Sequence, residues 1–293
     1  MIGSSITIRG SSQKHFGTLV TLFPGSLHLR FNFVSLATVV VLSLPSTGHA
    51  YFPFITDDTG TQGQGGNQLE INYVFTKERG IDIAEDGTYY SGEFGTRNVF
   101  PITYTRGLTE DLDVFVGIIR QTSPINGWMN AGIGFKWTFA GDQKEGWSFA
   151  IKPLLLTPVG RGMQASGLGN GLTNGSVSII SSYVKPQYEI HINGRYISNR
   201  AYGDPENQQA PHLWGVSVAP IWVLNHQWKL GVDAGLETNP NTTSSRLGYA
   251  QIGAVYAPVE NVQIGLGLIG IRALGSTGKE YNWSLMSGIT WQF

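Results

Sequence analysis

Apolar and polar residues alternate with a period of two along most of the chain from Asn67 onward. Successive side chains of a strand point to opposite faces, so this pattern predicts strands with one apolar face and one small or polar face. The end of the chain shows it most clearly, because one parity holds Tyr281, Trp283, Leu285, Ser287, Ile289, Trp291 and Phe293. We predict twelve such segments, at 68–77, 94–106, 111–121, 129–139, 147–157, 176–185, 187–198, 212–224, 227–237, 246–257, 261–272 and 281–293.

The lengths of these segments and of their connections indicate a closed barrel in a membrane. Each segment has roughly the 9–11 residues, or slightly more, that a tilted transmembrane strand needs. Connections after the even-numbered segments are short, whereas those after the odd-numbered segments are longer on average and include 78–93 and 158–175. Short periplasmic turns alternating with long external loops are typical of outer-membrane barrels. The predicted fold class is therefore all-β, a transmembrane antiparallel β-barrel of about 12 strands of the bacterial outer-membrane type.

Tryptophan placement favours the same fold. The Trp residues lie near predicted strand ends, where membrane barrels carry aromatic girdles at the two interfaces with water. Trp128 does not share parity with Trp137, so we expect it in a loop or after a bulge. The expected interface residues on the turn side are Trp137, Trp147, Trp222, Trp228 and Trp291, and those on the loop side are Trp214 and Trp283.

The final residue adds a second feature of such barrels. A terminal Phe that closes an alternating strand resembles the C-terminal signature of bacterial outer-membrane barrels, which the assembly machinery reads. This resemblance makes Phe293 the expected assembly signal and the barrel assembly machinery an expected partner. The alternative is a soluble sheet whose last strand happens to end in Phe.

The first fifty residues predict a secretory signal. They carry Arg9, Lys14 and Arg30 and no acidic residue, followed by an apolar run over about 33–44 and then Pro45. That run is too short to span a membrane as a helix. Small residues before position 51 fit cleavage after Ala50. We therefore expect 1–50 to be a signal peptide with an extended n-region, 51–66 to be an irregular segment at the periplasmic mouth or in the lumen, and 67–293 to be the barrel.

Composition narrows the class of protein further. Only 13% of the residues are charged, about half of what soluble domains carry. Low charge without long apolar runs is typical of transmembrane strands, whose lipid-facing and lumen-facing residues alternate. The chain has no Cys, which excludes disulfides and thiolate chemistry. It has no basic patch that would bind nucleic acid.

Three stretches resemble one known family. F-P-F-I-T-D-D-T-G-T at 52–61 with G-G-N-Q-L-E-I at 65–71, I-T-Y-T-R-G-L-T-E-D-L-D-V at 102–114, and L-L-L-T-P-V-G at 154–160 are similar to the outer-membrane transporters grouped as "MetA-pathway of phenol degradation". The resemblance covers nearly all of the mature chain and departs from it in the Gly- and Asn-rich insertion at 161–175. It implies transport of small, hydrophobic or aromatic compounds.

Motifs for catalysis or metal binding are not found. The sequence has no H-E-x-x-H, G-x-S-x-G or Walker motif, and G-L-G-N-G at 167–171 is predicted to lie in a surface loop. Asp57 and Asp58 lack a neighbouring His or third acid, so turn formation is favoured over metal binding. Outer-membrane phospholipase A, which is also a barrel, needs a His-x-Ser pair. Neither His191 nor His226 is followed by a Ser at that spacing. We expect no cofactor, no metal and no catalytic residue.

Polar residues on the inward parity are the candidates for a solute pathway, because Lys or Arg facing lipid costs about 2–4 kcal/mol at the membrane midplane. They form either a salt-bridged plug or a selective constriction. The set is Glu70, Asn72, Lys136, Lys152, Glu189, His191, Asn193, Arg195, Lys229, Asp233, Gln251 and Gln263. The sequence thus predicts an outer-membrane channel or passive transporter. The alternatives are a lipid-modifying barrel enzyme and a structural barrel with a closed lumen.

Overall fold

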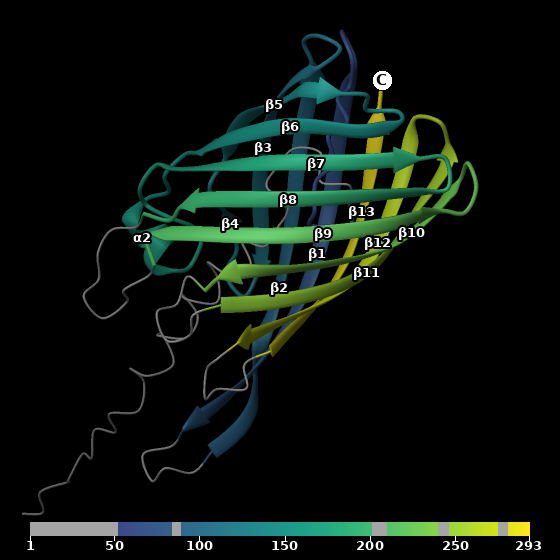
Figure 1. Cartoon of the computed structure of the whole chain (residues 1–293). Coiled ribbons are helices and arrows are strands. Elements are labelled where there is room, and N and C mark those ends of the chain that lie inside the picture. Colours follow the sequence, from purple (N-terminus) through teal and green to yellow (C-terminus); the bar gives the residue numbers. More distant parts are fainter. Residues whose placement is uncertain (1–51, 84–88, 201–209, 240–245, 275–280) are drawn as a thin grey trace, which may run out of the picture.

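The computed structural model describes residues 52–83, 89–200, 210–239, 246–274 and 281–293. Within these ranges the chain forms twelve long strands, a two-residue strand and one five-residue helix (Figure 1). The elements are β1 (Asn67–Ile83), β2 (Tyr89–Gly107), β3 (Leu112–Ser123), β4 (Gly127–Trp128), β5 (Gly132–Gly141), β6 (Gly146–Leu156), α2 (Arg161–Ala165), β7 (Asn174–Lys185), β8 (Tyr188–Ser198), β9 (His212–Val223), β10 (Trp228–Thr238), β11 (Arg246–Val259), β12 (Val262–Leu274) and β13 (Tyr281–Gln292). The predicted signal peptide and its cleavage site lie outside the described residues and stay a prediction.

The long strands pair with their neighbours in sequence and close into a barrel. All pairings are antiparallel, and β1 also pairs with β13 from Gln68–Gln292 to Arg79–Tyr281. Beyond the last strand, the backbone N–H and C=O groups of Phe293 both pair with Asn67. Each of the twelve long strands that the structure describes therefore pairs with a neighbour on both sides, as a strand structure in lipid requires. The predicted twelve-stranded antiparallel barrel is confirmed.

Burial alternates along the strands as the sequence pattern predicts. In β12, Ile264, Leu266 and Leu268 are exposed on the outside, whereas Gly265 and Ile269 are buried on the inside. The outer face of the barrel is consequently apolar. All predicted interface Trp residues except Trp283 are 40–64% exposed, and Trp283 is half-buried. Trp128 lies in β4, where the Arg120 guanidinium sits 5.1 Å from the centre of its ring.

The first hairpin is longer than the sequence predicts. We expected a loop over 78–93, but β1 and β2 extend into it, with pairs from Arg79–Glu93 to Ile83–Tyr89. A register shift at Glu78–Arg79 breaks the alternation there. A bulge displaces side chains from strict period two. The pattern is therefore lost from the sequence although the backbone pairing persists.

The segment predicted at 129–139 and the insertion at 161–175 also differ from expectation, because they pack on each other. The strand β5 begins only at Gly132, and the preceding Met129 belongs to the same buried apolar cluster as Leu168. The Asn130 amide donates to the backbone oxygens of Thr157 and Asn170. Figure 1 shows β4 and α2 at the end of the barrel opposite the C-terminus. Among the described residues, no helix combines the length and apolar character needed to span a membrane.

Candidate functional site

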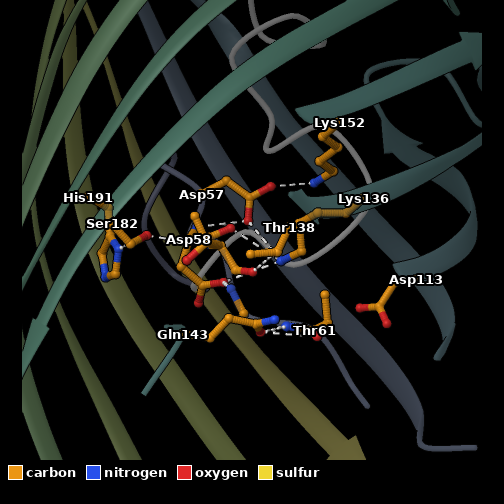
Figure 2. Close-up of polar contacts among 12 residues, drawn as sticks. Asp57, Asp58, Thr61, Asp113, Lys136, Thr138, Gln143, Lys152, Ser182 and His191 are labelled. Carbon is orange, nitrogen blue, oxygen red and sulfur yellow. Dashed lines mark hydrogen bonds and ion pairs between the residues drawn. The ribbon is translucent and has the colours of Figure 1, made fainter. Parts of the chain in front are cut away.

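The segment 52–62 lies inside the barrel and contacts the wall on several sides. Phe54 and Thr56 are fully buried, and Asp57 and Thr59 are nearly so. The wall partners come from strands distant in sequence, including β3, β5, β6, β7 and β10. Such partners can meet one segment only in the interior of a closed barrel. This occupied lumen is the candidate functional site (Figure 2).

Two carboxylates of the segment meet two buried lysines of the wall. The Lys152 ammonium donates to Asp57 Oδ2 at 2.5 Å, and Lys136 Nζ lies 3.3 Å from Asp58 Oδ1 and 3.9 Å from Asp57 Oδ1. Figure 2 shows these four side chains converging. Both lysine side chains are 1% exposed. A buried ammonium is costly without an anionic partner, so these ion pairs hold the segment strongly in place.

The Asp233 carboxylate of the wall binds the two residues that precede Asp57 in the segment. The backbone N–H groups of Ile55 and Thr56 both donate to Asp233 Oδ2 at 2.7 Å. The Thr56 hydroxyl lies 2.7 Å from Asp233 Oδ1 and 2.8 Å from the Ser217 hydroxyl. Tyr249 donates its hydroxyl to the same carboxylate at 3.1 Å. Charge-assisted bonds of this kind are about twice as strong as neutral ones.

Hydroxyl groups of the wall bind the next residues. Thr59 Oγ1 lies 2.6 Å from Ser148 Oγ, and the Thr59 backbone N–H donates to Ser182 Oγ at 3.1 Å. The Thr138 hydroxyl donates to the Thr59 carbonyl oxygen at 2.5 Å. Gln62 ends the occupied stretch, and its backbone N–H reaches Asp113 at 3.0 Å. These contacts are made by side chains of the wall. Breaking them would therefore leave the strand pairing of the barrel intact.

The apolar start of the segment packs against glycines of β10, β11 and β12. A Cβ added at Gly253 would lie 2.8 Å from Pro53 Cγ and 2.9 Å from Phe54 Cε1. A Cβ at Gly231 would lie 2.8 Å from Phe54 Cζ. The absence of side chains here creates the space that Pro53 and Phe54 occupy.

The residues predicted to line the lumen have side chains that point inward. The buried members are Glu70, Asn72, Lys136, Lys152, Glu189, His191, Asn193, Asp233 and Gln251. The half-buried members are Arg195, Lys229 and Gln263. Several contact the segment directly, since Gln251 donates to the Pro53 carbonyl oxygen and the Asn193 amide pairs with the Asp57 backbone.

Two ion pairs within the wall lie beside the occupied lumen. Lys229 donates to Glu189 at 2.7 Å, and Arg195 forms an ion pair with Glu237. Glu237 was not among the residues predicted to line the lumen, although it lies on the same face of the strand as Asp233. Its position near the end of a predicted strand concealed this role.

The structure also brings a serine, which the sequence did not predict to line the lumen, to His191 and Glu189, which it did. Ser182 Oγ lies 2.8 Å from His191 Nδ1, and Glu189 Oε2 lies 3.4 Å from His191 Nε2. The serine is on β7, so no His-x-Ser spacing could reveal it. Ser182 is fully buried and accepts the Thr59 N–H. A substrate therefore has no access to this hydroxyl while the segment is in place.

In the described part of the chain, no group of three His, Cys, Asp or Glu residues is placed where it could hold a metal ion. Asp57 and Asp58 face lysines instead of further ligands. Asp58 also accepts the Gly60 backbone N–H at 2.8 Å, a local turn of the kind that the sequence predicts for this pair.

Comparison with solved structures finds the same architecture in known channels. The chain is similar to an outer-membrane channel from Pseudomonas putida F1, with a TM-score of 0.60 and 11% identity over 80% of this chain and 98% of that one. It is also similar to the NanC porin, with a TM-score of 0.53 and 10% identity over 76% of this chain and 98% of the porin. No protein-family model and no curated protein sequence matches the chain. At these identities the likeness shows the fold alone, which is an antiparallel β-barrel of the kind that these two proteins have.

Proposed function

We propose that this protein is an outer-membrane channel through which small solutes diffuse passively, with the segment 52–62 as its resident plug. The observation that carries the proposal is a barrel that closes without this segment. Strand pairing completes the wall, whereas the segment is bound to it largely by side chains. Displacing the segment would therefore open the lumen and leave the barrel intact.

The proposed location follows from the outer surface. Exposed Leu, Ile, Val, Phe and Trp side chains cover the outside of the strands, and in water so large an apolar surface would aggregate. Outer-membrane lipid is the partner that fits it. The predicted signal at 1–50 would direct the chain there by export, with cleavage after Ala50.

The proposed solutes are small, hydrophobic or aromatic compounds. The basis is the resemblance of 52–61, 102–114 and 154–160 to the phenol-degradation transporter family. The segment 52–61, which carries part of that resemblance, also occupies the lumen. No cofactor is needed for diffusion.

Liposome swelling tests this function. Purified protein in liposomes should admit phenols and aromatic acids faster than sugars of similar mass, because the lumen offers both apolar and polar groups to an aromatic solute. Protein-free liposomes and liposomes with heat-unfolded protein are the controls. Equal swelling with and without folded protein for every solute would contradict the channel.

A lipid-modifying enzyme is the second candidate, and the contact between Ser182 and His191 is the observation that favours it. Replacement of Ser182 or His191 by Ala should leave phospholipid hydrolysis at the background level of the wild type if the protein is a channel. Hydrolysis that both replacements abolish would favour the enzyme.

A structural barrel with a closed lumen would give no swelling even after the segment is removed.

We also propose that the barrel assembly machinery reads the last strand through Phe293. Its ring stacks on Trp291 with centroids 4.4 Å apart, and it is exposed on the outside of the barrel. Phe293→Ala should lower the amount of folded barrel in the outer membrane several-fold. The measurement is the heat-modifiable band on a gel, with Phe139→Ala as the control, because Phe139 is another exposed outer aromatic away from the closing strands. Equal losses for both variants would indicate a general effect of removing an outer ring.

A further inference from the structure

Two ammonium groups of the barrel wall face the same point of the lumen. Lys136 on β5 and Lys152 on β6 lie between the paired positions Gly134–Leu154 and Trp137–Ile151. Like charges on opposed positions of neighbouring strands repel, and buried charges need partners. The wall therefore needs an anion at this point, whichever molecule supplies it.

Acidic groups of the wall supply part of the negative charge that acts on the two lysines. Asp113 lies opposite Lys136 in the register of β3 and β5 and also accepts the Gln62 N–H. Glu70 adds a negative charge that acts on Lys152 by electrostatic attraction. The segment adds a direct contact, since the Lys152 ammonium lies 2.5 Å from Asp57 Oδ2. Asp57 and Asp58 thus place carboxylates where the wall presents its lysines.

An aromatic ring adjoins these lysines. Lys152 Nζ lies 5.1 Å from the centre of the Phe115 ring, which is buried on the inner face of β3. Gly134 allows the ring to lie against β5, because a Cβ there would come within 2.5 Å of Phe115 Cζ. A cationic group beside an aromatic face suits a ligand that joins a carboxylate to a flat apolar body.

We propose that Lys136 and Lys152 bind the carboxylate of a small aromatic acid, and that Asp57 fills this site as an internal substitute until the solute enters. The inference rests on the proposed channel function and names its solute class. A carboxylate on a short tether competes at an effective concentration in the millimolar range. The free acid therefore binds the wild type weakly and binds much better once the tethered carboxylates are neutralised.

Isothermal titration calorimetry of the detergent-solubilised full-length mature protein with benzoate, in a chloride-poor buffer, tests this site. Asp57→Asn with Asp58→Asn should bind benzoate about tenfold more tightly than the wild type, or better, because the internal competitor is gone. Adding Lys136→Gln and Lys152→Gln should abolish that binding. Lys185→Gln, which removes a lysine at the end of β7 where it pairs with Glu145, should leave it unchanged.

Benzyl alcohol, which has the ring without the carboxylate, separates carboxylate recognition from apolar binding. Benzoate binding that the lysine replacements do not reduce, or benzyl alcohol binding of equal strength, would overturn the inference. So would the absence of benzoate binding to a variant shown to be folded by its heat-modifiable band. Since calorimetry does not require conduction, these outcomes are independent of swelling and single-channel currents, which test the channel itself.

Discussion

Deletion of residues 52–61 should raise the single-channel conductance several-fold in planar bilayers. In the intact protein Phe54, Thr56, Asp57 and Thr59 occupy the interior of the barrel, so ions must pass through space that protein atoms fill. A barrel of about twelve strands is wider than the eight-stranded ones whose side chains alone fill the interior. Without the segment, water should enter and surround the freed side chains of Lys136, Lys152 and Asp233.

Two controls make this result specific to the segment. Replacement of 52–61 by a Gly/Ser sequence of equal length keeps the chain length but removes every anchoring side chain, and it should conduct nearly as well as the deletion. Asp57→Asn alone should give brief openings between closed periods, because Thr56 and Thr59 keep their bonds to the wall. Unchanged conductance in the deletion variant would contradict a plug, provided that the heat-modifiable band shows a folded barrel.

The strands could be predicted from the sequence because lipid and lumen demand opposite chemistry of alternate residues. Ile264, Leu266 and Leu268 show this contrast against the glycines between them. The prediction failed where packing within the protein replaced that contrast. The strands β1 and β2 continue past a bulge as far as the pair Ile83–Tyr89, and the Asn130 amide binds the chain at Thr157 and Asn170. Neither arrangement depends on alternation, so neither leaves a periodic signal.

The candidate site could be predicted only in part, for a related reason. Parity alone suffices to propose an inward direction for Lys136, Lys152 and Asp233. Which residues meet across the barrel depends on the register of several hairpins and on the path of a segment without regular structure. The sequence therefore predicts only a turn at Asp57 and Asp58, although their carboxylates also pair with two lysines of the wall. The contact of Ser182 with His191 likewise depends on the β7–β8 register.

Gly253→Val should displace the plug without changing any charge or shortening the chain. The three atoms nearest to a Cβ at this position all belong to Pro53 and Phe54, at 2.8–3.1 Å, so the added methyl groups must push the segment away from β11. Valine is well tolerated in a strand, which leaves the wall stable. Overpacking costs about 1–3 kcal/mol, and each 1.4 kcal/mol is a factor of ten in an equilibrium. The released state should become roughly ten- to hundredfold more populated.

A single introduced cysteine can measure that release, since the chain has none of its own. Thr56→Cys is fully buried in the plugged state, so a water-soluble maleimide should label it slowly in the parent and faster by the same factor after Gly253→Val. Gly270→Val is the matched control on the next strand, because a Cβ there meets no atom within 4 Å and its side faces outward. Equal labelling rates in the two valine variants would mean that the space left by Gly253 is not needed to keep the segment in the lumen. A faster rate only in Gly253→Val would show that the fit between Phe54 and a bare stretch of wall, together with the ion pairs, keeps the lumen filled.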